Sequence, residues 1–227
     1  MSKKKNKEEG IKKKDFIEID YSGIIKETNQ VFDTTKKETA MKEKIYNKNI
    51  KYKPIIICVG ENQVVRGLDK ALEGKNTGDN FKTELKPEEA FGKKKAELLK
   101  LISKRKFREQ NINPLPGMEV NIDNQMGIIR SSSGGRVIVD FNHPLANKEI
   151  IYEVTINKKI KDTQKQIESL MEMWGIPSKE VKIDKENKKA ILKFENPKIA
   201  KNIIPVLGDK ITKKIEELCN IKKVDFK

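Results

Sequence analysis

The stretch from Val59 to Gly74, VGENQVVRGLDKALEG, constrains the fold more than any other part of the chain. Two apolar residues, Val64 and Val65, lead directly into a short amphipathic helix that ends near the glycine. We expect this helix to bring Leu68 beside aromatic residues and one carboxylate, Asp33. Because no nucleophile accompanies them, the predicted apolar hollow suits chemistry that forms no covalent bond.

The composition favours several small modules and gives no clear sign of a nucleic-acid reader. The chain has 227 residues, of which 37% are charged and 36% hydrophobic, a polar balance for a globular protein. The net charge of +15 comes almost entirely from lysine, and the arginines form no compact array for reading bases. A solvated lysine surface and attraction to ribosomal RNA or acidic clients both fit this charge.

The sequence suggests neither a metal site nor a secreted or membrane protein. Cys58 and Cys219 fit no disulfide, redox or metal-ligand spacing, and a single histidine, His143, excludes a site with several histidines. The segment 131–135 lacks the lysine of a nucleotide-binding P-loop. No apolar run is long enough for a signal peptide or a membrane span. We therefore expect no metal, no cofactor, no membrane association and a cytoplasmic location.

The hydrophobic pattern changes twice along the chain. Alternating or apolar runs predict strands at residues 16–25, 54–59 and 81–85, and then a small β-rich piece beginning near Lys93. After Lys161 the apolar residues Ile167, Leu170, Met171 and Trp174 recur at helical spacing. A hairpin and a second helix follow, so this tail predicts an α-β-β-α unit of marginal size that docks on the chain or dimerises.

Four motifs follow one another along the chain: Asp20–Gly23, Val31–Thr34, Gly60–Gly74 and Pro87–Gly92. In this order they resemble FKBP-type peptidyl-prolyl isomerases. The residues 139–146 resemble the point where the domain resumes after the inserted chaperone module of SlyD-like members, and the tail after Lys161 resembles the extra domain of long-type archaeal members. The resemblance covers nearly all of the chain from about residue 12.

The resemblance implies an α+β fold with three parts. Residues 12–92 and 137–160 would form an FKBP-like curved antiparallel sheet over one short helix. Residues 93–136 would form an inserted-flap chaperone domain, and residues 162–227 a C-terminal α-β-β-α domain. Residues 1–11 are predicted to be a disordered, charged lead-in.

The activity implied is the rotation of X–Pro bonds in unfolded or nascent polypeptides, without acid–base chemistry. The Val65 N–H would hold a substrate carbonyl, and Asp33 would orient Tyr21 or place a negative charge near the twisting amide. Leu68 and Phe91 stand where many members carry tryptophan and tyrosine. The catalytic set is Tyr21, Asp33, Val65 and Phe91. The substrate-binding set is Phe32, Ile55, Val64, Leu68, Leu145 and Tyr152.

A purely structural role is the alternative for each of these residues. The apolar members would be core in any fold, and Asp33 alone would cap a turn with Thr34 or Thr35. A holdase chaperone with little isomerase activity and an RNA- or ribosome-associated basic factor are the competing functions. The resemblance leaves open an FK506-type macrolide ligand and a homodimer through the C-terminal domain. The predicted chaperone groove consists of Leu98, Leu101, Met118, Val120 and Ile122.

Overall fold

The computed structural model describes residues 10–176, 178–194 and 196–226. The chain divides into two compact units. The first unit contains residues up to Glu84 and from Ile151 onward, and the second unit contains Leu85–Ile150. Most of the predicted lead-in lies outside the described residues. Ile11, however, is buried and exchanges backbone hydrogen bonds with Gly74 and Lys75, so the lead-in is shorter than predicted.

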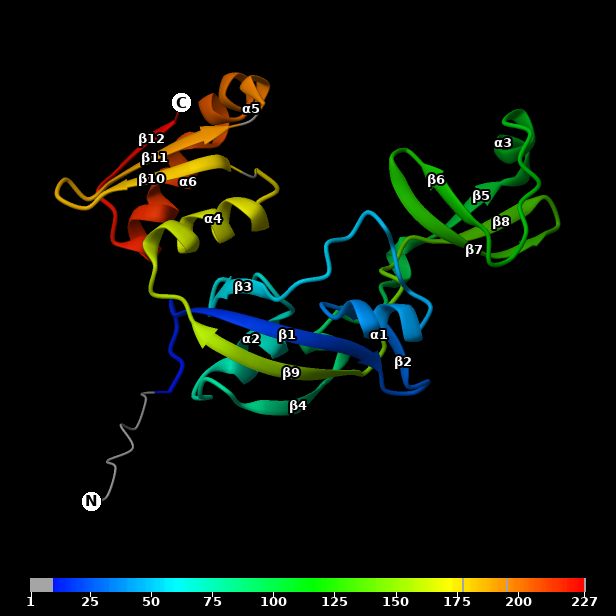
Figure 1. Ribbon diagram of the computed structural model, residues 1–227. Helices are drawn as coiled ribbons and strands as arrows, with labels where there is room; N and C mark the ends of the chain where they lie inside the picture. Colours follow the sequence, from blue (N-terminus) through cyan, green and yellow to red (C-terminus); the bar gives the residue numbers. More distant parts are fainter. Residues whose placement is uncertain (1–9, 177, 195, 227) are drawn as a thin grey trace, which may run out of the picture. The chain divides into compact units, whose positions relative to one another are not determined.

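The first unit is built on a five-stranded sheet of order β2-β1-β9-β4, with β3 also paired to β1 (Figure 1). Ile17 lies opposite Ile57, and Ile19 opposite Ile55, in the antiparallel pair of β1 and β3. Leu68 and Leu72 of the short helix α2 are buried, as the amphipathic pattern predicted. The α+β fold expected from the sequence is confirmed. The elements are β1 Phe16–Ile25, β2 Gln30–Thr34, α1 Lys37–Lys42, β3 Ile55–Cys58, α2 Arg66–Leu72, β4 Asn80–Leu85 and β9 Ile150–Lys159.

The C-terminal part of the first unit has its own three-stranded sheet, in the order β10-β11-β12. The last strand, which the sequence analysis missed, runs parallel to β11 after the long helix α6. One core cluster joins Ile167 and Ile215 of this part to Phe16 and Cys58 of the first sheet, so it docks on the rest of the unit. The elements are α4 Thr163–Met173, β10 Ser178–Asp184, β11 Lys189–Phe194, α5 Pro197–Asn202, α6 Ile204–Cys219 and β12 Lys223–Phe226.

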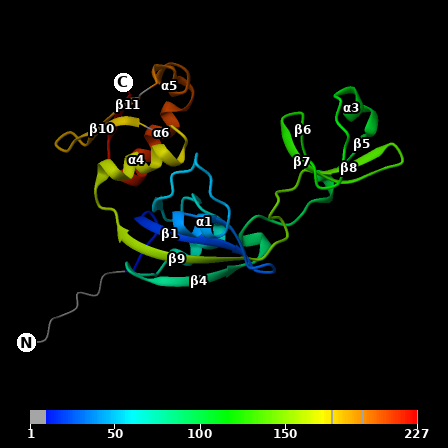
Figure 2. The same cartoon turned by 45° about the vertical axis from the view of Figure 1, so that its right-hand side comes forward.

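The second unit contains an antiparallel sheet of order β5-β8-β7-β6 (Figure 2). Ser103 caps α3, because its hydroxyl accepts the Arg105 N–H. Residues 137–160 were predicted to belong to the isomerase domain. However, β8 pairs with β5 and β7 of the insert, so the insert extends to Asp140. The elements are the 3-10 helices Pro87–Glu89 and Ala96–Leu98, β5 Leu99–Ser103, α3 Lys104–Glu109, β6 Glu119–Ile122, β7 Gln125–Ser133 and β8 Arg136–Asp140. Within the described residues, no helix is long and apolar enough to cross a bilayer.

Candidate active site

Tyr21 and Asp33 are joined by a hydrogen bond between two neighbouring strands. Asp33 lies opposite Gly23 in the register of β1 and β2, and Tyr21 is two residues from that glycine on the same face. The Tyr21 hydroxyl donates to the Asp33 carboxylate at 2.7 Å. Burial, and then the hydrogen bond and charge of Asp33, raise the pKa of Tyr21 well above its usual value. The tyrosine therefore stays protonated and acts as a hydrogen-bond donor.

Two further aromatic rings, those of Tyr152 and Phe32, lie next to this pair. Tyr152 on β9 is 4% exposed, and its ring centroid lies 5.8 Å from that of Tyr21, edge to face. The Phe32 centroid lies 6.1 Å from that of Tyr152, at an interplanar angle of 81°. Burial, and secondarily the charge of Asp33, raise the pKa of Tyr152. The three rings thus form an apolar wall beside a single carboxylate.

Gly23 allows Phe32 to lie close to β1. A Cβ atom added at this glycine would lie 2.5 Å from Cζ of the phenylalanine ring, much closer than side-chain contacts in proteins allow. Any larger residue would therefore push the ring away from β1. The glycine of the Asp20–Gly23 motif thus helps to position the aromatic wall.

The loop that leads into α2 is held by a buried acid that the sequence analysis missed. Asp69 on α2 is 5% exposed, and its carboxylate accepts the Gly60 N–H at 2.9 Å and the Asn62 N–H at 3.0 Å. Gly60 and Asn62 both have positive φ, of 90° and 52°. Val65 is the N-cap of α2, where N–H groups lack acceptors within the helix. One feature of the sequence could have identified Asp69: it is an acid next to the apolar residues of an amphipathic helix.

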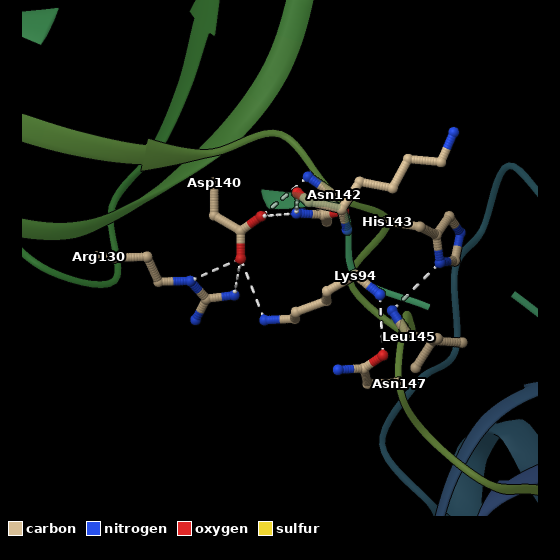
Figure 3. Close-up of polar contacts among 8 residues, drawn as sticks. Lys94, Arg130, Asp140, Asn142, His143, Leu145 and Asn147 are labelled. Carbon is tan, nitrogen blue, oxygen red and sulfur yellow. Dashed lines mark hydrogen bonds and ion pairs between the residues drawn. The ribbon is translucent and has the colours of Figure 1, made fainter. Parts of the chain in front are cut away.

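Five more predicted site residues occupy different surroundings. Val64 is half-buried in the same loop, and Leu68 is buried at the start of α2. Ile55 lines a separate hollow together with residues of α4. Phe91 and Leu145 belong to the second unit, so their position at the pocket stays a prediction. There, Phe91 stacks on His143 with ring centroids 4.6 Å apart. The Leu145 N–H donates to Nδ1 of the same histidine at 3.1 Å (Figure 3).

Known families match two parts of the chain. The model described as FKBP-type peptidyl-prolyl cis-trans isomerase matches residues 7–107, and that of the FKBP26 IF domain matches residues 100–145. The short-type peptidyl-prolyl cis-trans isomerase of Methanocaldococcus jannaschii is 30% identical over 154 residues, which cover 68% of this chain and 94% of the relative. The chain belongs to the FKBP-type peptidyl-prolyl cis-trans isomerase family.

Bacterial members of the FKBP family are also similar to this chain. The SlyD isomerase of Haemophilus influenzae is 35% identical over 108 residues, which cover 45% of this chain and 56% of the relative. The 16 kDa FKBP-type isomerase of Escherichia coli is 31% identical over 108 residues, which cover 46% of this chain and 72% of the relative. The predicted resemblance to SlyD-like and archaeal FKBP isomerases is thereby confirmed.

The insert of this FKBP-type isomerase has a different exposed face from the one predicted. Val120 is buried in the core of the second unit, and Ile122 packs against that core, so neither lines an exposed groove. Leu98 is half-buried, whereas Leu101 is 59% and Met118 is 41% exposed. The alternation along β6 identified one face correctly, but that face points inward. The exposed apolar residues that the prediction missed are Leu99, Leu115, Met126 and Ile138.

A cluster of ion pairs and hydrogen bonds around the buried Asp140 carboxylate ties together the segments at the base of the insert (Figure 3). Asp140 accepts hydrogen bonds from Lys94 Nζ at 3.1 Å, from Arg130 Nη2 at 2.8 Å and from the Asn142 backbone at 2.9 Å. Asn142 in turn bonds both the N–H and the carbonyl of Lys95. Burial alone would raise the Asp140 pKa, but the bonds from Asn142, Lys94 and Arg130 outweigh it and hold that pKa well below its usual range.

The two cysteines of the FKBP chain are unsuited to act as nucleophiles. Cys58 and Cys219 are both buried in one core cluster, and neither forms a disulfide. Burial, and then the charges of Glu61 and Asp69, raise the pKa of Cys58 to about 12. Burial raises the pKa of Cys219 to about 12 as well. Both thiols therefore stay protonated and unreactive near neutral pH.

The raised pKa values of these two thiols should make the protein less stable at alkaline pH. Their folded pKa values exceed the value of about 8.5 for a free cysteine, so the unfolded chain releases its protons first. The free energy of unfolding should therefore fall as pH rises above about 8.5 towards 12. Urea unfolding across this range measures the slope, and a Cys58→Ala, Cys219→Ala double variant should show a shallower one. Equal slopes in the two proteins would contradict the assignment.

Proposed function

We propose that this FKBP-type isomerase binds a prolyl residue against Tyr21, Phe32, Leu68 and Tyr152 and rotates the preceding peptide bond. The observation that supports this best is the Tyr21–Asp33 hydrogen bond of 2.7 Å beside the buried Tyr152 ring. It combines an apolar surface with a single oriented carboxylate. The substrates would be unfolded or nascent polypeptides that contain proline.

The physical chemistry of the peptide bond explains why such a surface suffices. Rotation costs about 18–20 kcal/mol because amide resonance is lost, although the two X–Pro isomers differ by about 0.5–1 kcal/mol. The planar amide separates more charge than the twisted amide does. An apolar site therefore disfavours the planar ground state relative to the twisted transition state. The N–H of Val65 would hold the substrate carbonyl while the bond turns.

Asp33 gives the sharpest test of this site. Asp33→Ala removes the acceptor of the Tyr21 hydroxyl, and we expect kcat/KM on a short X–Pro peptide to fall about tenfold or more. Asp33→Asn keeps an acceptor oxygen without the charge, so it separates orientation of Tyr21 from electrostatics. Full activity in both variants would remove Asp33 from the mechanism.

We propose that the insert captures extended polypeptides and delivers them to the site. β5 is an edge strand of its sheet, and its exposed Leu99 and Leu101 offer both apolar contacts and free backbone groups. Leu101 lies directly opposite the exposed Ile138 of β8, so the apolar surface continues on to the next strand. A holdase role beside the isomerase role follows from this surface.

Charges placed on β5 should separate the two roles. In the Leu99→Lys, Leu101→Lys double variant, we expect suppression of client aggregation to be lost and activity on a short X–Pro peptide to be kept. Val206→Lys is the matched control, because it places lysine on an exposed apolar residue of α6 outside the insert. Light scattering of an aggregating client measures the effect. Unchanged suppression in the double variant would refute capture by this strand.

We further propose that residues 162–227 form the extra domain of long-type archaeal members. Their separate sheet β10-β11-β12, packed with α4 and α6, supports this assignment. A homodimer through this part and the binding of an FK506-type macrolide stay predictions. Sedimentation of the full chain and of a variant without residues 162–227 tests the dimer.

A further inference from the structure

The loop before α2, residues 60–65, is held by hydrogen bonds on two sides. On the inner side, the buried Asp69 binds the N–H groups of Gly60 and Asn62. On the other side, the carboxylate of the intervening Glu61 accepts a hydrogen bond from Lys214 Nζ at 2.8 Å. Lys214 lies on α6, 153 residues further along the chain. The C-terminal part of the chain therefore reaches the loop that carries Val64 and Val65.

The surroundings of this ion pair favour a defined geometry. Glu61 is 21% and Lys214 is 43% exposed, so the pair is shielded more than a typical surface pair. Lys214 also lies 3.4 Å from Glu217, which in turn binds Lys14 at 2.9 Å. The hydrogen bond to Glu61 is the largest cause of a raised Lys214 pKa, which keeps the ammonium charged.

A hollow lies beside the Lys214–Glu61 ion pair, between the loop and helices α4 and α6. It has a volume of about 360 Å³, and Glu61 and Gln63 of the loop line one part of it. The other parts are lined by Leu170 of α4, Trp174 at the C-cap of α4, and Leu207, Lys210, Ile211 and Lys214 of α6. Glu61 and Gln63 are half-buried at this hollow, and Lys214 contacts the loop at its edge.

We propose that Lys214 is a positioning residue of the isomerase site, which holds Glu61 and thereby the loop that presents the Val65 N–H. This inference rests on the proposed function, in which that N–H binds the substrate carbonyl. It gives the C-terminal part a role in the enzyme itself, as an outer brace for the substrate-binding loop. Because Lys214 touches no substrate, its effect should appear mainly in substrate binding.

The test compares full-length variants on a short X–Pro peptide. We expect Lys214→Ala to raise KM about two- to fivefold with little change in kcat, the range of one partly shielded ion pair. Lys214→Arg should restore KM, because the guanidinium still reaches a carboxylate. Lys53→Ala is the matched control. Its ion pair with Glu172 also joins the C-terminal part to the first sheet, at 2.8 Å, but it lies outside the loop.

Two further readouts distinguish positioning from a loss of stability. Amide hydrogen exchange at residues 60–65 should accelerate in Lys214→Ala and stay at the wild-type rate in Lys53→Ala. In a Glu61→Gln background, Lys214→Ala should have no additional effect on KM, since the two residues act as a pair. An unchanged KM in Lys214→Ala, or an equal rise in Lys53→Ala, would overturn the inference. An inactive wild type would instead refute the proposed function.

Discussion

Replacing Asp140 by alanine is expected to destabilise the second unit by about 1–3 kcal/mol, the cost of leaving its hydrogen-bond donors without an acceptor. Asp140 is 2% exposed and accepts bonds from Lys94, Arg130 and Asn142. Its removal leaves these donors without their shared acceptor at the base of the insert. Hydrogen exchange of the β5–β8 amides measures the effect on this unit. The single tryptophan, Trp174, lies in the first unit and would not report it.

A control and a pH dependence accompany this prediction. Glu97→Ala removes a carboxylate of the same unit that is 73% exposed, and it should change stability by less than about 0.5 kcal/mol. Because the folded pKa of Asp140 lies below its unfolded value, its contribution is complete above about pH 4 and is lost as pH falls further. Exchange rates in Asp140→Ala that match those of Glu97→Ala would contradict a stabilising cluster.

Tyr152→Ala is expected to have the second large effect, because it removes the ring that both Tyr21 and Phe32 contact. Truncation of a buried aromatic residue costs about 3–5 kcal/mol, and the apolar wall of the site would lose its central member. Tyr152→Phe keeps the ring and its contacts at 5.8 and 6.1 Å, so it should retain most stability and most activity. Urea unfolding and peptide isomerisation measure the two effects. Equal loss of activity in both variants would mean that the hydroxyl matters rather than the ring.

Local sequence patterns predicted where helices and strands occur in this chain better than they predicted which strands pair. The amphipathic α2 and the strand over residues 16–25 both depend on neighbouring residues, and the structure contains each of them. The parallel strand β12 was missed because four residues carry little periodicity and their partner β11 lies about thirty residues earlier. Strand pairing of this kind is a long-range property that a local window does not encode.

The same distinction applies to the functional residues. The motif order correctly brought Tyr21, Phe32, Asp33 and Tyr152 together, because the family resemblance carries long-range information. Alternation along β6 was recognised, but a period of two does not say which face is inward, and so Val120 was assigned to the surface. Asp140 was missed because its partners come from positions 94, 130 and 142, and only the fold brings them together.

The refolding of a client that is limited by proline isomerisation shows whether the first unit rotates X–Pro bonds. The slow phase of such refolding takes tens to hundreds of seconds without a catalyst. Catalytic amounts of the full-length protein are predicted to accelerate this phase, and Asp33→Ala is predicted to accelerate it much less. A slow phase that keeps its uncatalysed rate in the presence of the wild-type protein would contradict the account.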